Sequence, residues 1–295
     1  MASLIRSRVA AACIALTAVA AAGCSSHPMA DNSTQGGDVP KVAAPTDLLT
    51  AGTLKLGASL TYPPLGYLDS AGNQVGLDPE LSTMVAAEFG LKKEMTNQQF
   101  ATLIPSLQAH QVDALFTSIF ITKERAAAVD FIPYFETGQA FVVKAGSSYQ
   151  PQAATDLCGK TVSVLQGSVT DEIASGEIGD ACKASGNPLT VKKFPTDPEA
   201  TQEVLSGRAD VWFTDRSVAV FQTDSTLKGK LEVASKQILY PVAVGIAVRK
   251  GDTQMKDAFQ AAIDALAKGG QLASELDKYG LSPVTDEVLN QSLAS

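Results

Sequence analysis

The sequence predicts an α/β protein made of two lobes of similar design. Two segments resemble each other in residue type at nearly every position, Gln111–Ser118 (QVDALFTS) and Arg208–Asp215 (RADVWFTD). Each follows a helical pattern with apolar residues at i, i+3 and i+4, and each runs through a buried strand into polar residues. Residues 54–61 and 161–170 are a second pair, each a strand followed by a polar turn. Because helix–strand units recur throughout α/β proteins, a single large domain is the alternative.

The individual elements follow from hydrophobic periodicity and turn signals. Strands are expected at residues 53–57, 114–116, 139–144, 161–165, 189–194, 208–213 and 241–248, with a hairpin tip at 69–73. Helices are expected at residues 79–89, 100–109, 123–129, 170–174, 199–205, 255–266 and 271–279. Residues 131–135 are expected to form a turn, and the tail beyond Gly280 is polar.

The N-terminal residues predict export. Residues 1–23 have the charged start and the short apolar run of a signal peptide. The stretch Ala21–Cys24 resembles the bacterial lipoprotein cleavage box, so we expect Cys24 to be the lipidated first residue, with palmitate among its acyl chains. An ordinary secretory signal or a membrane anchor is the alternative, although the run is short for a membrane span. Residues 24–52 are expected to be a flexible tether, because residues 25–46 are rich in Ser, Gly, Pro, Asn and Asp and have almost no large apolar side chain.

Charge and cysteine usage exclude several functions. Without residues 1–23 the chain has 21 basic and 31 acidic side chains, a net charge of −10, which disfavours nucleic acid and anionic membrane surfaces as partners. Cys158 and Cys182 are the two thiols left once Cys13 and Cys24 are set aside, and in an exported protein we expect them to form one disulfide. His27 and His110 are the only histidines and lie far from these cysteines in sequence, so no metal site and no cofactor are expected.

An anion site is predicted where the first repeated segment ends. Thr122 is a helix N-cap candidate, which places Arg125 in the first helical turn, where cations are unfavourable. Arg125, the free N–H groups and the hydroxyls of Thr117 and Ser118 would together suit a carboxylate. The alternative is a surface salt bridge between Arg125 and a local acid such as Glu124 or Asp130.

A matching cation site is predicted in the second repeat. Ligands of open α/β sheets bind beyond the carboxyl ends of the strands, so Thr117–Ser118 and Thr214–Asp215 would face a shared cleft. Asp215 can pair with an ammonium group there, or simply cap the helix that follows it. Arg125 and Asp215 on opposed lobes would suit a zwitterion. Tyr62 and Phe100 lie in or beside polar turns, where they can wall a ligand or only pack.

Several motifs occur in the order typical of one protein family. The most specific is Ile121–Arg125 (ITKER), followed by Val129–Phe131 and Tyr134. The others are Leu56–Gly57, Tyr62–Pro64, Gly76–Leu81, Leu103–Leu107, Asp156–Lys160, Gln166–Ser168, Gly207–Asp210 and Gly245–Val248. On these motifs, roughly residues 53–281 resemble the extracellular solute-binding proteins of family 3, which serve ABC importers for polar amino acids.

The resemblance implies a two-lobed periplasmic-binding-protein type II fold, in which each lobe is a mixed sheet flanked by helices. Two hinge strands, near residues 140–145 and 240–247, would join the lobes. Lobe 1 would comprise residues 53–142 and 243–295, and lobe 2 residues 143–242. A Cys158–Cys182 disulfide is also similar to one found in many members of the family.

The resemblance also implies roles for single residues. Arg125 matches the arginine that binds the α-carboxylate of the ligand, and Asp215 the aspartate that binds its α-ammonium group. The other implied ligand contacts are Thr117, Ser118, Gln166, Ser168, Val169 and Thr170, with Tyr62 and Phe100 as aromatic walls. Ser59 stands where members for lysine or arginine often have an acid, which disfavours a cationic ligand, and Phe120 and Val169 replace common hydroxyl residues.

These observations predict a monomeric, lipid-anchored extracytoplasmic receptor that binds an amino acid and delivers it to an ABC permease, and that is not an enzyme. The alternative is an enzyme on the same fold, a dehydratase or lyase of small carboxylates. That function needs a general acid or base, for which Asp215 and Glu172 are the candidates. A sensor input module is a third hypothesis, for which the sequence has no signalling domain.

Overall fold

Residues 41–294 are described by a computed structural model of the 295-residue chain. The expected signal peptide, the expected lipidation site Cys24 and the expected tether up to residue 40 lie outside the described residues. Residues 41–52, which were also assigned to the tether, contact the folded body. The backbone N–H of Lys41 donates to the carbonyl oxygen of Glu88 at 2.9 Å, and three apolar side chains of this segment pack against the core.

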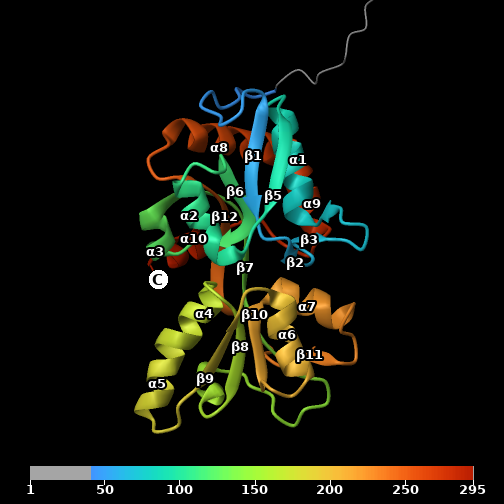
Figure 1. Cartoon of the computed structure of the whole chain (residues 1–295), viewed down its shortest axis with the longest axis vertical. Coiled ribbons are helices and arrows are strands. Elements are labelled where there is room, and N and C mark those ends of the chain that lie inside the picture. The colour runs from blue at the N-terminus through green and yellow to red at the C-terminus, as the bar shows by residue number, and fades with distance from the viewer. Residues whose placement is uncertain (1–40, 295) are drawn as a thin grey trace, which may run out of the picture. The chain divides into compact units, whose positions relative to one another are not determined.

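Within residues 41–294, nine strands form one hydrogen-bonded sheet in the order β5-β1-β6-β12-β7-β10-β8-β9, with β11 beside β7 (Figure 1). These strands are β1 (Thr53–Ala58), β5 (Lys92–Asn97), β6 (Ala114–Phe120), β7 (Val129–Lys144), β8 (Thr161–Leu165), β9 (Thr190–Phe194), β10 (Val211–Asp215), β11 (Leu231–Val233) and β12 (Leu239–Arg249). A small separate sheet contains β2 (Thr61–Tyr62), β3 (Gly66–Leu68) and β4 (Gln74–Val75). The fold is therefore mixed α/β, as predicted.

Two groups of helices cover the two ends of the sheet. The helices are α1 (Leu77–Glu88), α2 (Leu103–Gln108), α3 (Lys123–Ala128), α4 (Val169–Ile173), α5 (Gly179–Ala184), α6 (Asp197–Leu205), α7 (Arg216–Asp224), α8 (Thr253–Lys268), α9 (Gln271–Asp277) and α10 (Asp286–Ala294). Figure 1 shows α4 to α7 around β8, β9 and β10, and the other helices around β1, β5 and β6. We call the group around β1 and β6 lobe 1 and the group around β8 and β10 lobe 2.

The internal repeat has a structural counterpart in each lobe. In lobe 1, Asp113 lies just before β6, and its carboxylate accepts the backbone N–H of Lys55 in the parallel strand β1 at 2.8 Å. In lobe 2, Asp210 lies just before β10, and its carboxylate accepts the N–H of Thr161 at the start of the parallel strand β8, also at 2.8 Å. The two aspartates thus join equivalent pairs of strands.

The strands β7 and β12 connect the lobes. β7 pairs with β12 from Val129 to Gln139, and then with β10 from Gln139 to Val142. The change of partner at Gln139 comes slightly before the expected hinge at 140–145. Within β7 the pairing with β12 shifts between Phe135 and Pro133, which leaves Tyr134 as the extra residue of a bulge. Proline lacks the N–H that a regular ladder needs, so a bulge suits this position.

Some elements differ from the sequence-based expectation. The pairs Thr117–Ser118 and Thr214–Asp215 were expected beyond the ends of their strands, but Thr117–Ser118 lies inside β6 and Thr214–Asp215 forms the last two residues of β10. Both strands are buried along their whole length. Residues 131–135, expected to form a turn, belong to β7. The polar tail contains α10, which the sequence pattern did not predict. The predicted packing of residues 255–266 is confirmed: Met255, Phe259, Ile263 and Leu266 of α8 are buried.

The predicted disulfide between Cys158 and Cys182 is present, with a Cα–Cα distance of 5.0 Å. It joins the start of lobe 2 to α5 across 24 positions of sequence. Replacing both cysteines with serine is expected to lower the free energy of unfolding by roughly 3 kcal/mol, because an unlinked loop of this length gains entropy on unfolding. Urea denaturation of the oxidised wild type and the double variant measures this difference; equal midpoints and slopes would contradict it.

Candidate functional site

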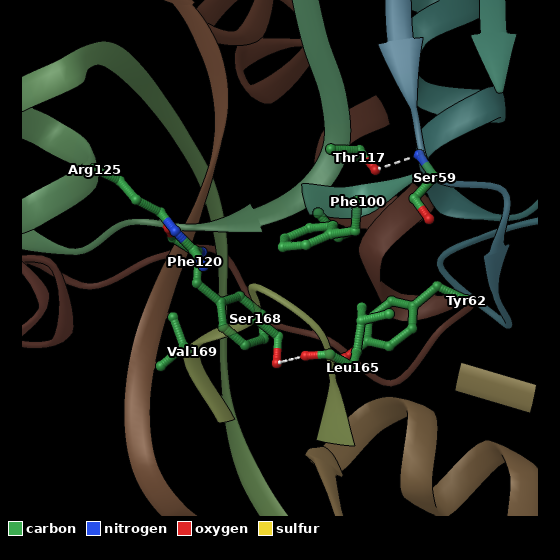
Figure 2. A pocket seen from close by; sticks show the side chains of 10 residues that line it. Ser59, Tyr62, Phe100, Thr117, Phe120, Arg125, Leu165, Ser168 and Val169 are labelled. Atoms are coloured by element: carbon green, nitrogen blue, oxygen red, sulfur yellow. Dashed lines mark hydrogen bonds between the residues drawn. The ribbon is translucent and has the colours of Figure 1, made fainter. Parts of the chain in front are cut away.

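A small cavity lies between the two lobes, with a volume of about 20 Å³. Its walls come from lobe 1 and from the β8–α4 corner of lobe 2 (Figure 2). The lining residues are Ser59, Tyr62, Phe100, Thr117, Ser118, Phe120, Arg125, Leu165, Ser168 and Val169. This volume is room for about one water molecule. A larger ligand therefore needs the walls to move apart.

Arg125 is the charged group of the cavity. Thr122 caps α3 by accepting the backbone N–H of Arg125 at 3.2 Å, as predicted, and this fixes the arginine in the first helical turn. The guanidinium donates from Nη1 to the carbonyl oxygen of Phe120 at 3.2 Å, and its carbon lies 5.6 Å from the centre of the Phe100 ring. The residue is only 6% exposed, and burial lowers the pKa of its guanidinium, an effect that Glu172 opposes.

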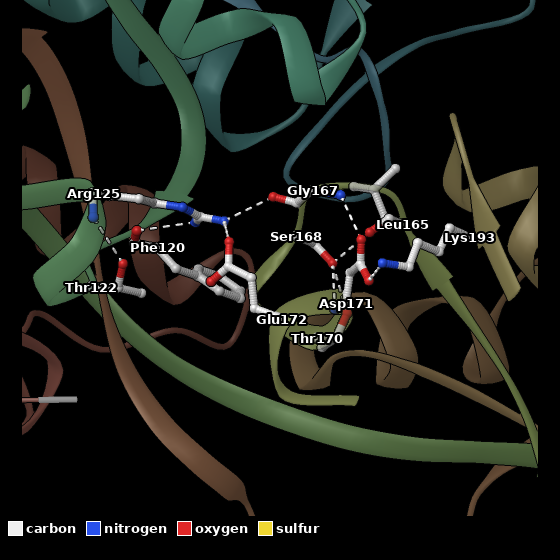
Figure 3. A network of polar contacts seen from close by, with 10 residues as sticks. All are labelled: Phe120, Thr122, Arg125, Leu165, Gly167, Ser168, Thr170, Asp171, Glu172 and Lys193. Atoms are coloured by element: carbon white, nitrogen blue, oxygen red, sulfur yellow. Dashed lines mark hydrogen bonds and ion pairs between the residues drawn. The ribbon is translucent and has the colours of Figure 1, made fainter. Parts of the chain in front are cut away.

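The salt-bridge partner of Arg125 is neither Glu124 nor Asp130, the two local acids that the sequence suggested, but Glu172. Nη2 of Arg125 donates to Oε1 of Glu172 at 3.1 Å and to the carbonyl oxygen of Gly167 at 3.0 Å (Figure 3). Both partners belong to lobe 2. Asp130, one of the expected partners, is paired with Lys250 instead. The arginine therefore joins the two lobes across the cavity.

The hydroxyl groups of β6 are held by a buried network. Oγ1 of Thr117 accepts the N–H of Ser59 at 2.9 Å. Ser118 adopts a left-handed backbone conformation with φ 47°, which few residues other than glycine adopt, and its Oγ donates to Asp78 at 2.8 Å. Asp78 also accepts the hydroxyl of Tyr134, the bulge residue of β7, at 2.6 Å. The Ser118 oxygen keeps its lone pairs, so it can accept a donor from a ligand.

Lobe 2 contributes one helix start to the cavity. Ser168 caps α4 by accepting the N–H of Asp171, and its hydroxyl also contacts that of Thr170 at 2.8 Å. Ser168 and Val169 line the cavity together with Leu165, which the sequence analysis did not single out. Gln166 and Thr170 were expected to contact the ligand, but neither lines the cavity, because Gln166 faces solvent and Thr170 is buried in its own helix.

Asp215 lies at the end of β10, fully buried, and does not line the cavity. Its Oδ1 caps α7 by accepting the N–H groups of Ser217 at 2.6 Å and Val218 at 3.1 Å. Its Oδ2 is buried and has no hydrogen-bond partner among residues 41–294. Burial raises the pKa of this carboxyl group, an effect that the side chains of Ser217 and Thr137 oppose. Asp215 therefore caps α7 through Oδ1, and its Oδ2 can accept a hydrogen bond from a ligand.

Tyr62 links the cavity to Asp215. Its hydroxyl lies near the side chain of Thr214 and the backbone of Asp215, and both of these groups lower its pKa. Burial raises the pKa of the Tyr62 hydroxyl, and the carboxylates of Asp215 and Asp197 raise it further. Asp197, at the start of α6, is also fully buried; its Oδ2 makes no hydrogen bond of ordinary geometry within residues 41–294, although the side chain of Trp212 is close enough to lower the pKa of the carboxyl group. A polar cluster with two acidic oxygens therefore lies next to this wall of the cavity.

The structure brings together most of the residues that the sequence singled out. Nine of the twelve expected ligand contacts line one cavity; Gln166, Thr170 and Asp215 do not. Sequence reasoning did not find Leu165, the Asp78–Tyr134 support of Ser118, or the contact between Glu172 and Arg125. No periodic or spacing signal identifies such contacts, because the residues involved are tens of positions apart.

Within residues 41–294, no group of three or more His, Cys, Asp or Glu side chains is placed to hold a metal ion. The helices described here are all too short or too polar to cross a bilayer.

Residues 54–282 match the family model of the bacterial extracellular solute-binding proteins, family 3. The L-arginine-binding protein of Pseudomonas aeruginosa is 33% identical over 233 residues, which cover 77% of this chain and 87% of that protein. The L-cystine-binding protein TcyJ of Escherichia coli is 28% identical, over 79% of this chain and 85% of its own length.

Solved structures of amino-acid-binding proteins are also similar to this chain. An ancestral arginine-binding protein bound to arginine superposes with a TM-score of 0.71 at 34% identity, over 78% of this chain and 98% of that one. The ancestral amino acid-binding protein AncCDT-1, described as a precursor of cyclohexadienyl dehydratase, superposes with a TM-score of 0.69 at 29% identity, over 77% and 95% of the two chains.

Proposed function

Because the chain belongs to the bacterial extracellular solute-binding proteins of family 3, we propose that it captures an amino acid between its lobes and delivers it to an ABC importer. The main support for this proposal is the position of Arg125. Its guanidinium is buried in the wall of an interlobe cavity, and one carboxylate already accepts a hydrogen bond from it. A buried guanidinium with a planar fork of donors suits the α-carboxylate of an amino acid.

Asp215 supplies the complementary charge. Its Oδ2 is buried and makes no hydrogen bond of ordinary geometry within residues 41–294, although the side chain of Thr137 is close enough to lower the pKa of the carboxyl group. An ammonium group would offer this carboxylate three donors. Oγ of Ser118 can accept another of these protons from the lobe 1 side. For an ammonium group to reach Asp215, Tyr62 has to leave its contact with the Asp215 backbone. We infer that this movement accompanies the widening of the cavity, with β7 and β12 as the hinge.

The remaining wall is apolar and aromatic. Tyr62, Phe100 and Phe120 present their rings to the cavity (Figure 2), and Leu165 and Val169 close it from lobe 2. Ser59 also lines the cavity, and it stands where family members that bind lysine or arginine often have an acid. A neutral, partly apolar amino acid fits this lining better than arginine does, although arginine and cystine are named for the relatives.

The location follows from the family and the N-terminal sequence. We infer that the protein is extracytoplasmic, that the acylated Cys24 anchors it to the membrane, and that it meets the permease as a monomer. The net charge of −10 without residues 1–23 supports a role for the lipid, rather than the protein surface, in holding it at an anionic membrane.

An enzyme on this fold is the second candidate, favoured by the likeness to AncCDT-1. It needs a general acid or base that can reach a substrate. Of the two candidates, Glu172 is paired with Arg125 and Asp215 caps α7, so neither faces the cavity as a free acid. A binding function needs no proton transfer from either residue, and is the one we propose.

Titration calorimetry of the mature protein against the proteinogenic amino acids and L-cystine tests the proposal. At least one amino acid is expected to bind, because its carboxylate can form a buried ion pair with Arg125 and its ammonium group one with Asp215. Its amide, which lacks the carboxylate, and its 2-oxo acid, which lacks the ammonium group, are expected to bind about 100-fold more weakly or worse, since each leaves one buried charge unpaired. If no amino acid binds, or if the amide binds equally well, the proposed function is wrong.

A further inference from the structure

Glu172 is an acid of lobe 2 that occupies a donor of the carboxylate-binding arginine. Its Oε1 lies 3.1 Å from Nη2 of Arg125, and the two residues belong to different lobes and are 47 positions apart (Figure 3). The side chain of Arg125 is 7% exposed, whereas that of Glu172 is 44% exposed. Glu172 therefore reaches from a partly hydrated helix surface to a buried guanidinium.

The donors of Arg125 are largely used in this arrangement. Nη1 donates to the carbonyl oxygen of Phe120, and Nη2 donates to Glu172 and to the carbonyl oxygen of Gly167. A ligand carboxylate binds an arginine most strongly through two parallel N–H groups. Such a carboxylate cannot take both outer donors of the fork while Glu172 holds Nη2.

Charge repulsion opposes a shared site as well. Two carboxylates on one guanidinium are like charges within a few ångströms of each other, which disfavours their simultaneous ionisation. Asp171 and Glu124 add negative charge near Glu172. A ligand carboxylate would therefore replace Glu172 at Arg125 rather than join it.

The contact also favours the narrow cavity. Both lobe 2 partners of Arg125, the Gly167 carbonyl and the Glu172 carboxylate, hold the β8–α4 corner against lobe 1. With these contacts made, the cavity measures about 20 Å³, far less than an amino acid needs. The Arg125–Glu172 pair thus stabilises an arrangement that excludes the ligand.

We propose that Glu172 is a built-in competitor for the α-carboxylate of the ligand, whose displacement from Arg125 sets the affinity of the site. This inference rests on the proposed function, because it assumes that Arg125 receives the carboxylate. The residue itself is a positioning and affinity-setting group. It does not take part in binding once the ligand is in place.

The test compares wild type with Glu172→Gln, which removes the charge and keeps the shape of the side chain. Calorimetry with L-glutamine and with L-arginine as probes is expected to show about tenfold tighter binding to the variant. The substitution removes the partly exposed Arg125–Glu172 ion pair, which stabilises only the unliganded protein, so less free energy is lost when the ligand binds. The matched control is Asp180→Asn, an exposed acid of α5 in the same lobe, which is expected to leave both affinities unchanged.

A second readout needs no amino acid. Phenylglyoxal modifies accessible arginines, and peptide mass spectrometry reports the rate at each site. Arg125 is expected to react several-fold faster in Glu172→Gln than in wild type, while Arg208, which pairs with Glu203 on the surface, reacts equally in both.

The outcomes separate this inference from the proposed function. Unchanged or weaker amino-acid binding in Glu172→Gln, with wild type binding normally, overturns the inference and leaves the proposed function standing. If wild type binds no amino acid, the proposed function fails, and the labelling rate of Arg125 alone decides whether Glu172 shields it. Equal labelling in both proteins overturns the inference in that case too.

Discussion

Arg125→Ala is expected to weaken amino-acid binding by about 1,000-fold or more, because a ligand carboxylate would then be buried without a counterion. The guanidinium is 6% exposed and lies against the Phe100 ring, so its charge is largely shielded from solvent. Titration calorimetry with the best wild-type ligand measures the loss. Circular dichroism of both proteins checks that the fold is kept, since Arg125 also binds two backbone carbonyls.

Two further variants sharpen this result. Arg125→Lys keeps the charge but loses the planar fork, so its affinity is expected to lie between those of wild type and Arg125→Ala. Arg208→Ala removes an exposed arginine of lobe 2 that pairs with Glu203, and is expected to bind as wild type does. An Arg125→Ala protein that binds its ligand with wild-type affinity would show that the carboxylate is recognised elsewhere.

The strands of the two lobes could be predicted from the sequence only in part. The repeat at Asp113 and Asp210 identified equivalent strands, because the same residue types recur where the same local contacts are made. The position of strand ends was harder to predict. In β6 and β10 both faces are buried, so a polar pair such as Thr117–Ser118 does not mark the end of the strand. Residues 131–135 were expected to form a turn, whereas they belong to β7, where a bulge at Tyr134 follows Pro133.

For the candidate site, the sequence predicted which residues line the cavity better than it predicted which residues they contact. Thr122 as a cap and Arg125 in the following turn depend on neighbours three positions apart, which a local pattern can reveal. The contacts of Arg125 with Glu172 and of Ser118 with Asp78 join positions 47 and 40 residues apart. Such contacts depend on how the lobes and layers pack, and no local pattern encodes them.

Two buried acids are expected to make the stability of the protein fall as the pH rises from about 4 to 7. Burial is the main cause that raises the pKa of Asp78 and of Asp197 to about 7, from 3.8. The folded state therefore keeps protons that the unfolded state releases in this range. Each such proton lowers the free energy of unfolding by about 1.4 kcal/mol per pH unit, and the loss ends above the folded pKa. Urea denaturation at several pH values between 5 and 8 measures this slope.

The substitution Asp197→Asn tests the contribution of one of these two acids to the pH dependence of stability. The amide keeps an acceptor for Thr214, whose hydroxyl lies 3.4 Å from Oδ1, and it cannot ionise. Because wild-type Asp197 carries its proton at pH 5 and loses it by pH 8, the variant is expected to gain on the order of 2 kcal/mol relative to wild type across this interval. Asp257→Asn, an exposed position of α8, is the control and should follow the wild-type curve. A constant difference between wild type and Asp197→Asn from pH 5 to 8 would mean that Asp197 does not change its protonation in the folded protein, and that some other buried group, Asp78 first, accounts for any slope.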